Sequence, residues 1–137
     1  MEFFQVSPRQ IYGIHDPIGV KYLSRLRVGL SHLRADKFRH KFADTPSALC
    51  DCSNSPPETV EHFLLYCLSH NHRRIELFEK LRYIISLVTL ISPTYACDLL
   101  LYGNPIYTPD INRKILELTI EFLISSKRFD GPFILND

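Results

Sequence analysis

The sequence lacks the short motifs by which common enzyme classes are identified. It contains no G-x-S-x-G, no H-E-x-x-H and no glycine-rich phosphate loop. Glu61-His62 is not followed by a second histidine four residues later, so it is not half of a zinc-protease motif. A nucleophilic Cys67 served by His70 or His72 is an alternative, but nothing in the sequence marks an activated thiolate. We therefore predict that the chain is not an enzyme and takes no small-molecule substrate.

An uninterrupted apolar run of membrane-spanning length is also missing. The most apolar region, residues 83–101, is interrupted by Pro93 and carries Asp98. The first residues, MEFFQVSPRQIYG, include Glu2 and have no apolar core long enough for a signal peptide. We therefore expect an intracellular protein, nuclear or cytoplasmic, with no membrane partner. Thiols stay reduced there, so clustered cysteines are more often metal ligands than disulfides.

Charge is present but unevenly distributed. The formal net charge is +1, yet residues 17–41 carry seven Lys/Arg and a single acid, Asp36. Residues 42–137 carry eight Lys/Arg and twelve acids. This asymmetry indicates either a surface that faces a polyanion such as RNA or DNA, or simply a solvated helix face. The candidate nucleic-acid-binding residues are Arg25, Arg27, Arg34, Lys37, Arg39 and Lys41.

Lysine and arginine neutralise phosphates and release counterions, which gives salt-sensitive and sequence-tolerant binding. The four cations expected to contribute most are Arg34, Lys37, Arg39 and Lys41. Three aromatic side chains nearby could stack on bases: Tyr22, Phe38 and Phe42. Core packing is the alternative reading, and we expect it for Phe38 and Phe42.

Apolar residues at helical spacing dominate the rest of the sequence. Asp16 and Pro17 are typical of an N-cap and a first helical position. An apolar stripe follows at spacings of three and four: Leu23, Leu26, Leu30 and Leu33. Gly29 and Ser31 should break this helix, and Ser31 could cap a second one. Further helices are predicted at about residues 70–90, at 94–102 and from Thr108 onwards.

These patterns predict a small, mainly α-helical single domain over residues 1–137. Its expected parts are a basic helical segment (17–42), a zinc-binding loop and helix (43–69), part of a helical bundle (70–127) and an irregular tail (128–137). Within the second part, Ser55, Pro56 and Glu58 are typical of an N-cap, a first helical position and a capping box. A helix is therefore predicted to begin at Ser55.

The stretch CDCSNSPPETVEHFLLYC, residues 50–67, holds three of the four cysteines. Zinc favours four ligands from thiolate sulfur and imidazole nitrogen, and Cys₃His is an ordinary structural set. The expected metal ligands are Cys50, Cys52, His62 and Cys67. Such a site is closed to water, so the Zn²⁺ would be structural rather than catalytic. The helix must loosen near residues 65–66 for Cys67 to reach the metal.

Other readings of this stretch stay open at the level of sequence. Cys67 could be a core residue and His62 a hydrogen-bonded histidine, because isolated residues of both types usually are. His70 or His72 could replace His62 as a ligand, although both lie outside the bracketing cysteines. Cys97 has no partner nearby and is expected to be a buried apolar residue.

Three stretches together resemble a known region of retroelement proteins. They are RLRVGLSHLRADKFRHKF (25–42), LCDC (49–52) and ETVEHFLLYC (58–67). They are similar to the zinc-binding region found C-terminal to the polymerase in non-LTR retrotransposon reverse transcriptases. Arg27, Gly29 and Ser31 match its L-R-x-G-x-S element, and the later ACDLLLYGN and KRFDGP also look like the downstream part of such proteins. The metal positions match the family's Cys-rich loop and its E-[TS]-x-E-H-x-[LF]-x-x-C motif.

The resemblance implies a detached C-terminal piece that helps a larger reverse transcriptase hold template RNA or target DNA. The paired catalytic aspartates of the polymerase palm are missing, and there is no room for an endonuclease or RNase H domain. No polymerase activity is therefore expected. An alternative from a different class is a helical protein–protein interaction scaffold, and a non-functional retroelement remnant is a third reading. RNA or DNA, a larger reverse transcriptase and a helical protein are the corresponding partners.

Overall fold

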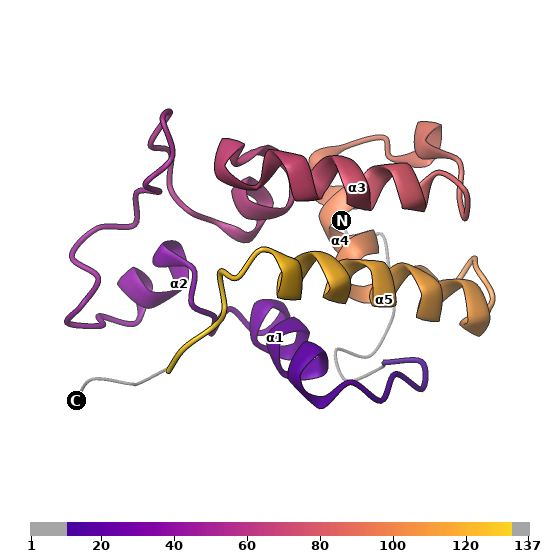
Figure 1. Ribbon diagram of the computed structural model, residues 1–137, viewed down its shortest axis with the longest axis horizontal. Coiled ribbons are helices and arrows are strands. Elements are labelled where there is room, and N and C mark those ends of the chain that lie inside the picture. Colours follow the sequence, from indigo (N-terminus) through magenta and orange to yellow (C-terminus); the bar gives the residue numbers. More distant parts are fainter. Residues whose placement is uncertain (1–10, 133–137) are drawn as a thin grey trace.

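The longest helix, α5 (Pro109–Ser125), packs against three other helices. In Figure 1 it lies between α3 (Asn71–Leu81) and α1 (Pro17–Arg27), and it also contacts α4 (Pro93–Tyr102). The computed structural model describes residues 11–132, which are mainly helical and contain no strand. The predicted fold class, a mainly α domain with a Cys₃His cluster, is confirmed.

Four shorter helical elements complete the described chain. They are α2 (Arg34–Arg39), a π-helical turn η1 (His62–Tyr66) and the 3₁₀ turns η2 (Leu68–His70) and η3 (Leu87–Thr89). Helix α2 and the loop that follows it lie at one end of the molecule, on the left of Figure 1, whereas α5 begins at the opposite end.

Three of the helices begin at a proline that follows a capping side chain. Their N-caps are Asp16, Ser92 and Thr108, and each side chain accepts a hydrogen bond from a backbone amide three residues later. This satisfies one of the amides that a helix start leaves without an intrahelical partner. The predicted starts at Asp16 and Thr108 are confirmed.

Close approach of the helices depends on two glycines. A Cβ atom on Gly19 would lie 2.2 Å from Cγ2 of Ile120, so this glycine lets α1 approach α5. Gly103 ends α4 with φ 72°, and a Cβ there would lie 2.5 Å from Oδ1 of Asn112. Asn112 instead joins the turn to α5, because its Oδ1 accepts from the amide of Asn104 and its Nδ2 donates to the Asn104 carbonyl.

The main hydrophobic core is formed by α1, α3, α4, α5 and the π-helical turn. Phe63 in that turn is fully buried and lies with its ring 5.2 Å from those of Phe122 and Phe129. It therefore anchors the segment that carries His62 and Cys67 against the end of α5. Edge-on and tilted contacts between aromatic rings stabilise the fold beyond the contribution from burying their apolar area.

The second helix differs from its prediction. It begins at Arg34, its N-cap position is Leu33, and Ser31 does not cap it. The amide of Arg34 donates to Oε1 of Glu58, 24 residues away, so a carboxylate from another segment caps this helix. Ser31 is buried and donates its hydroxyl to Oδ2 of Asp36.

The expectations for the three aromatic residues near α2 have mixed outcomes. Phe42 is buried, as expected, and so is Tyr22. Phe38 was expected in the core, but its relative exposure is 48%. It is therefore available to contact a ligand.

The predicted helix start at Ser55 is wrong. Ser55 has φ 45° and closes a turn in which its amide donates to the Cys52 carbonyl. The helix begins at Val60, and Oγ1 of Thr59 accepts from the amide of His62. Glu58 makes no capping box, because its carboxylate is occupied by Arg34 and Arg128.

No helix within residues 11–132 has the length and apolarity needed to cross a bilayer. Residues 1–10, which carry most of the signal-peptide expectation, lie outside the described residues, as do residues 133–137 of the expected irregular tail. Residues 128–132 form no helix, and the helix predicted over 70–90 ends at Leu81.

We predict that Glu58→Gln destabilises the protein more than a matched surface change does. Glu58 is buried and accepts two hydrogen bonds from Arg128, at 2.8 and 2.6 Å. Removing its charge leaves Arg128 without its counter-ion, which costs about 2–4 kcal/mol. Urea unfolding of the parent, Glu58→Gln and the exposed control Glu117→Gln at neutral pH measures this. Equal unfolding free energies for the two variants would contradict it.

The same comparison has a pH signature. Burial alone would raise the pKa of Glu58, but the hydrogen bonds and charge of Arg128 outweigh it and lower this pKa. The ion pair's contribution is therefore present above the unfolded-state pKa of about 4.3, and it is lost as the pH falls through the lower folded-state pKa. The stability difference between parent and Glu58→Gln should shrink over that acid range. A difference that grows on acidification would argue against the pairing.

Candidate metal centre

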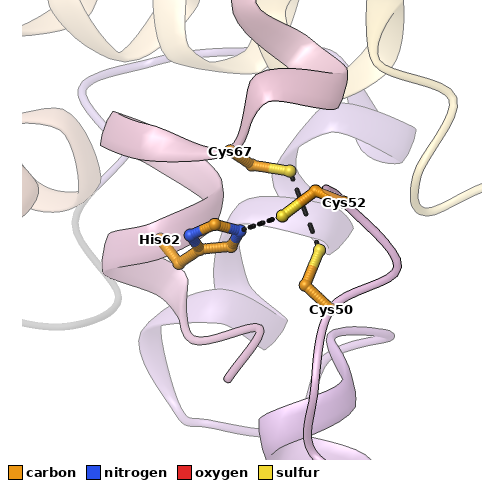
Figure 2. Close-up of side chains that lie close together, drawn as sticks. All are labelled: Cys50, Cys52, His62 and Cys67. Atoms are coloured by element: carbon orange, nitrogen blue, oxygen red, sulfur yellow. Dashed lines mark hydrogen bonds between the residues drawn. The ribbon is translucent and has the colours of Figure 1, made fainter. Parts of the chain in front are cut away.

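Four side chains expected to bind a metal converge at one point. The Sγ atoms of Cys50, Cys52 and Cys67 and a ring nitrogen of His62 all lie within 4.8 Å of one another, and all four residues are buried. Figure 2 shows them pointing toward a common centre, two from the loop and two from the helical segment. The arrangement could hold a metal ion.

Two of the distances between ligand atoms match those around a tetrahedral zinc ion. Ideal bonds of 2.3 Å to sulfur and 2.0–2.1 Å to nitrogen place two sulfurs about 3.8 Å apart and a sulfur and a nitrogen about 3.6 Å apart. The Sγ atoms of Cys50 and Cys67 are 3.7 Å apart, and Sγ of Cys52 lies 3.5 Å from Nε2 of His62. These two distances are close to the ideal ones, and every other pair of ligand atoms lies within 4.8 Å.

The first two ligands lie on a tight reversal of the chain. The amide of Cys50 donates to the carbonyl of Pro56, and the amide of Glu58 donates to that of Ala48. Between these bonds, the turn from Cys52 to Ser55 closes the loop. These backbone bonds bring Cys50 and Cys52 to the same side, facing the helical segment (Figure 2).

The other two ligands are brought together by the π-helical turn. In an α-helix, residues five apart are rotated by about 140° from each other, because each residue turns about 100°. Here the amide of Cys67 donates to the carbonyl of His62 at 2.7 Å, a bond between residues five apart. This wider turn is the loosening expected around residues 65–66, and such turns are frequent at functional sites.

Arg74 stabilises the wide turn from α3. Its Nε donates to the Leu64 carbonyl and its Nη2 to the Phe63 carbonyl, both at 2.9 Å. In a regular α-helix the amides of residues 67 and 68 would occupy those carbonyls. Arg74 is buried, so the guanidinium satisfies backbone groups that would otherwise be costly to bury.

The pKa shifts of the candidate ligands differ in direction. Burial raises the pKa of Cys50 to about 12. Burial would also raise the pKa of Cys52, but hydrogen bonds from the amides of Asn54 and Ser55 and from the neighbouring thiols outweigh it and lower this pKa. Burial lowers the pKa of His62, which favours the neutral ring that binds metals. A bound cation would deprotonate the thiols and release protons.

The alternative ligands are not part of the group. His70 packs edge-on against Phe63, with the ring centroids 5.0 Å apart, and exposed His72 lies 3.2 Å from a carboxylate oxygen of Glu76. Cys97 lies in the main core, and burial raises its pKa to about 12, as expected for a buried apolar residue.

The basic residues divide into two sets. Arg27 points inward, where its Nε donates to the Leu101 carbonyl at 2.6 Å and its guanidinium lies over the ring of Tyr102. Arg25 is half-buried on α1. The remaining candidates, Arg34, Lys37, Arg39 and Lys41, lie on or just after α2.

Three of those four form ion pairs, two with the loop after α2 and one within α2. Their partners are Asp51 for Arg34, Asp44 for Lys37 and Asp36 for Arg39, at 2.6, 2.7 and 2.8 Å. Lys41 is exposed and forms no ion pair with a described residue. Helix α2 therefore carries cations whose counter-ions are mostly exposed side chains.

Sequence reasoning missed the three residues that support the centre: Glu58, Arg74 and Arg128. Glu58 joins the metal loop to α2 and to the segment after α5, and Arg74 fixes the π-helical turn. The sequence does hold an indication that Arg74 is buried. Arg74 lies three residues before Leu77 and seven before Leu81, so it shares the apolar face of the helix with them. Nothing local in the sequence indicates that Arg128 meets Glu58, 70 residues earlier.

A scan against protein-family models and searches of curated proteins and of solved structures found no match. The assignment of the metal centre therefore rests on the geometry and chemistry of these side chains.

Replacing any one ligand should weaken metal binding at least tenfold, because three ligands leave an incomplete shell. The variants are Cys50→Ser, Cys52→Ser, His62→Ala and Cys67→Ser, and the matched control is Cys97→Ala. Titration with Co²⁺, followed by its thiolate charge-transfer absorption, gives one site in the parent and in the control. Full affinity in a ligand variant would remove that residue from the centre.

Proposed function

We propose that this chain is a zinc-stabilised, non-catalytic module that binds RNA or DNA. The observation that carries the proposal is the buried Cys₃His cluster beside the basic helix α2, whose Arg34 pairs with Asp51 between two of the cysteines. Three thiolates and one imidazole are a donor set typical of structural zinc, whereas harder cations prefer oxygen ligands.

A structural role for the ion follows from the closed shell. Four protein ligands complete a tetrahedral zinc site and leave no position for a water or a substrate. The free energy of zinc binding then adds to the stability of the folded protein, because the assembled site does not exist in the unfolded chain.

Support for the nucleic-acid surface comes from α2 and the residue stretch after it. Arg39 and Lys41 are exposed, and Phe38, which lies between Lys37 and Arg39 in the sequence, is 48% exposed. An aromatic ring flanked by cations is the combination that binds single strands, through base stacking and phosphate contacts. The Arg39 side chain is 57% exposed in its ion pair with Asp36, so it can reach a phosphate while Asp36 stays bonded to Ser31.

The resemblance to the zinc-binding region of non-LTR retrotransposon reverse transcriptases supports the same function. Its metal positions coincide with the converging side chains. Its L-R-x-G-x-S element has a structural explanation, since Arg27 anchors α1 to α4, Gly29 has φ 71° and Ser31 donates to Asp36. We propose that the chain derives from such an enzyme and acts beside its polymerase.

A second candidate is an interaction scaffold, favoured by one apolar groove. The groove lies between the start of α1 and the second half of α5 and has a volume of about 720 Å³. Ile14, Ile120 and Ile124 line it, with Asp16 and Glu117 at its edge. Light scattering separates the candidates, because a dimer that ignores nucleic acid would favour the scaffold.

The nucleic-acid proposal predicts that Arg39→Ala/Lys41→Ala weakens binding of a single-stranded oligonucleotide roughly tenfold. Loss of two phosphate contacts should also lower the slope of log affinity against log salt by about one to two. The control is Arg113→Ala/Lys114→Ala, which removes the same charge from the opposite end of the molecule (Figure 1).

Fluorescence anisotropy on the zinc-loaded full chain, at several salt concentrations, provides the measurement. Equal losses in the two double variants would mean that net charge, not this surface, determines binding. No binding by the parent chain to RNA or DNA at low salt would reject the proposal.

A further inference from the structure

A small polar hollow lies between α2, the loop after it and the segment that follows α5. It has a volume of about 200 Å³ and is lined by His32, Arg34, Lys37, Asp44, Thr45 and Arg128. Three cations from two distant parts of the chain therefore share one hollow with a single carboxylate. Like charges gather in this way at a cost in repulsion, which a bound anion would relieve.

The three cations are held in place but keep unused donors. Arg128 gives its Nε and Nη2 hydrogens to Glu58 and to the His32 carbonyl, while its Nη1 has no partner within residues 11–132. Arg34 uses its two Nη groups for the Leu49 carbonyl and for Asp51, and Lys37 gives one bond to Asp44. The carboxylates thus fix the cations before any ligand arrives, which lowers the entropic cost of binding.

The cations of the hollow act on His32, which lines its wall. Burial is the main reason that the pKa of His32 is lowered; a hydrogen bond with the backbone of Gly131 opposes this, and the charges of Arg128, Arg25 and Lys37 lower the pKa further. Arg128 and Lys37 therefore lie close enough to act on a charged group in the hollow. Thr45 adds a hydroxyl to the wall of the hollow.

The same two arginines separate this hollow from the metal centre. On their other side, a hollow of about 340 Å³ is lined by Asp51, Glu58, Cys50 and Cys67 together with Arg34 and Arg128. With three thiolates around a divalent ion, that side carries net negative charge and would repel anions. Only the side of Lys37 and Thr45 suits an anion.

We propose that the hollow between Arg34, Lys37 and Arg128 binds a phosphate group. The inference deepens the proposed function, because the phosphate would be one in the backbone of a bound strand. Donors that approach from separate directions fit a tetrahedral oxyanion better than a planar carboxylate, which pairs with a single guanidinium. Free inorganic phosphate carries the same kind of oxygen atoms, so it is the second ligand that this hollow would bind.

The test uses Lys37→Gln in the zinc-loaded full chain, with Lys114→Gln on α5 as the control. Lys37→Gln removes a charge from the hollow but touches neither the metal ligands nor Glu58. Binding of inorganic phosphate is followed by ³¹P NMR, and binding of an oligonucleotide by anisotropy. Lys37→Gln should weaken both at least fivefold, Lys37→Arg should restore most of the loss, and Lys114→Gln should change neither.

The outcomes separate this inference from the proposed function. Phosphate binding that depends on Lys37, with no binding of any oligonucleotide, supports the hollow and rejects the nucleic-acid proposal. Oligonucleotide binding that Lys37→Gln leaves unchanged, with no phosphate binding, overturns the hollow and leaves the proposed function standing. Absence of both kinds of binding in the parent overturns both.

Discussion

The segment from residue 43 to residue 59 meets the helices through the candidate metal ligands and through polar contacts of Asp44, Asp51 and Glu58. None of its side chains belongs to the main hydrophobic core within the described residues. Cys50, Cys52 and Cys67 instead form a separate buried cluster of their own. Three thiols and a ring that merely pack together bury little apolar area, whereas coordination would supply several strong bonds at once. A bound ion would therefore add to the polar contacts that hold the loop in position.

These polar contacts extend beyond the loop to the basic helix. Glu58 follows the metal loop directly, caps α2 through the amide of Arg34 and pairs with Arg128 after α5. Arg34 in turn pairs with Asp51, between the two loop cysteines. A loop displaced by loss of metal would thus release the cap and one counter-ion of α2 together. Metal binding and the arrangement of the cationic surface are one structural unit in this account.

Sequence patterns predicted the features that depend on near neighbours. The caps at Asp16 and Thr108 are local, since capping involves residues only a few positions apart. The four candidate ligands were identified from residue type and spacing, and the structure brings them together.

The errors arise where a distant partner overrides a local preference. Ser55 and Glu58 have the spacing of a capping box, but Arg34 and Arg128 occupy the Glu58 carboxylate and the helix starts later. Arg27 looked like one more surface cation, yet the Leu101 carbonyl, 74 residues away, draws it inward. Phe38 was expected in the core because it is apolar, but no residue of α2 is part of the main hydrophobic core. Whether such a side chain is buried depends on how whole helices pack together. The spacing of apolar residues in the sequence does not give that information.

X-ray absorption at the zinc edge of the purified, zinc-loaded full chain tests the central claim most directly. The account predicts a first shell of three sulfurs at about 2.3 Å and one nitrogen at about 2.0–2.1 Å. A shell made only of oxygen and nitrogen, or one with fewer than three sulfurs, would show that these side chains do not enclose the ion and would contradict the account.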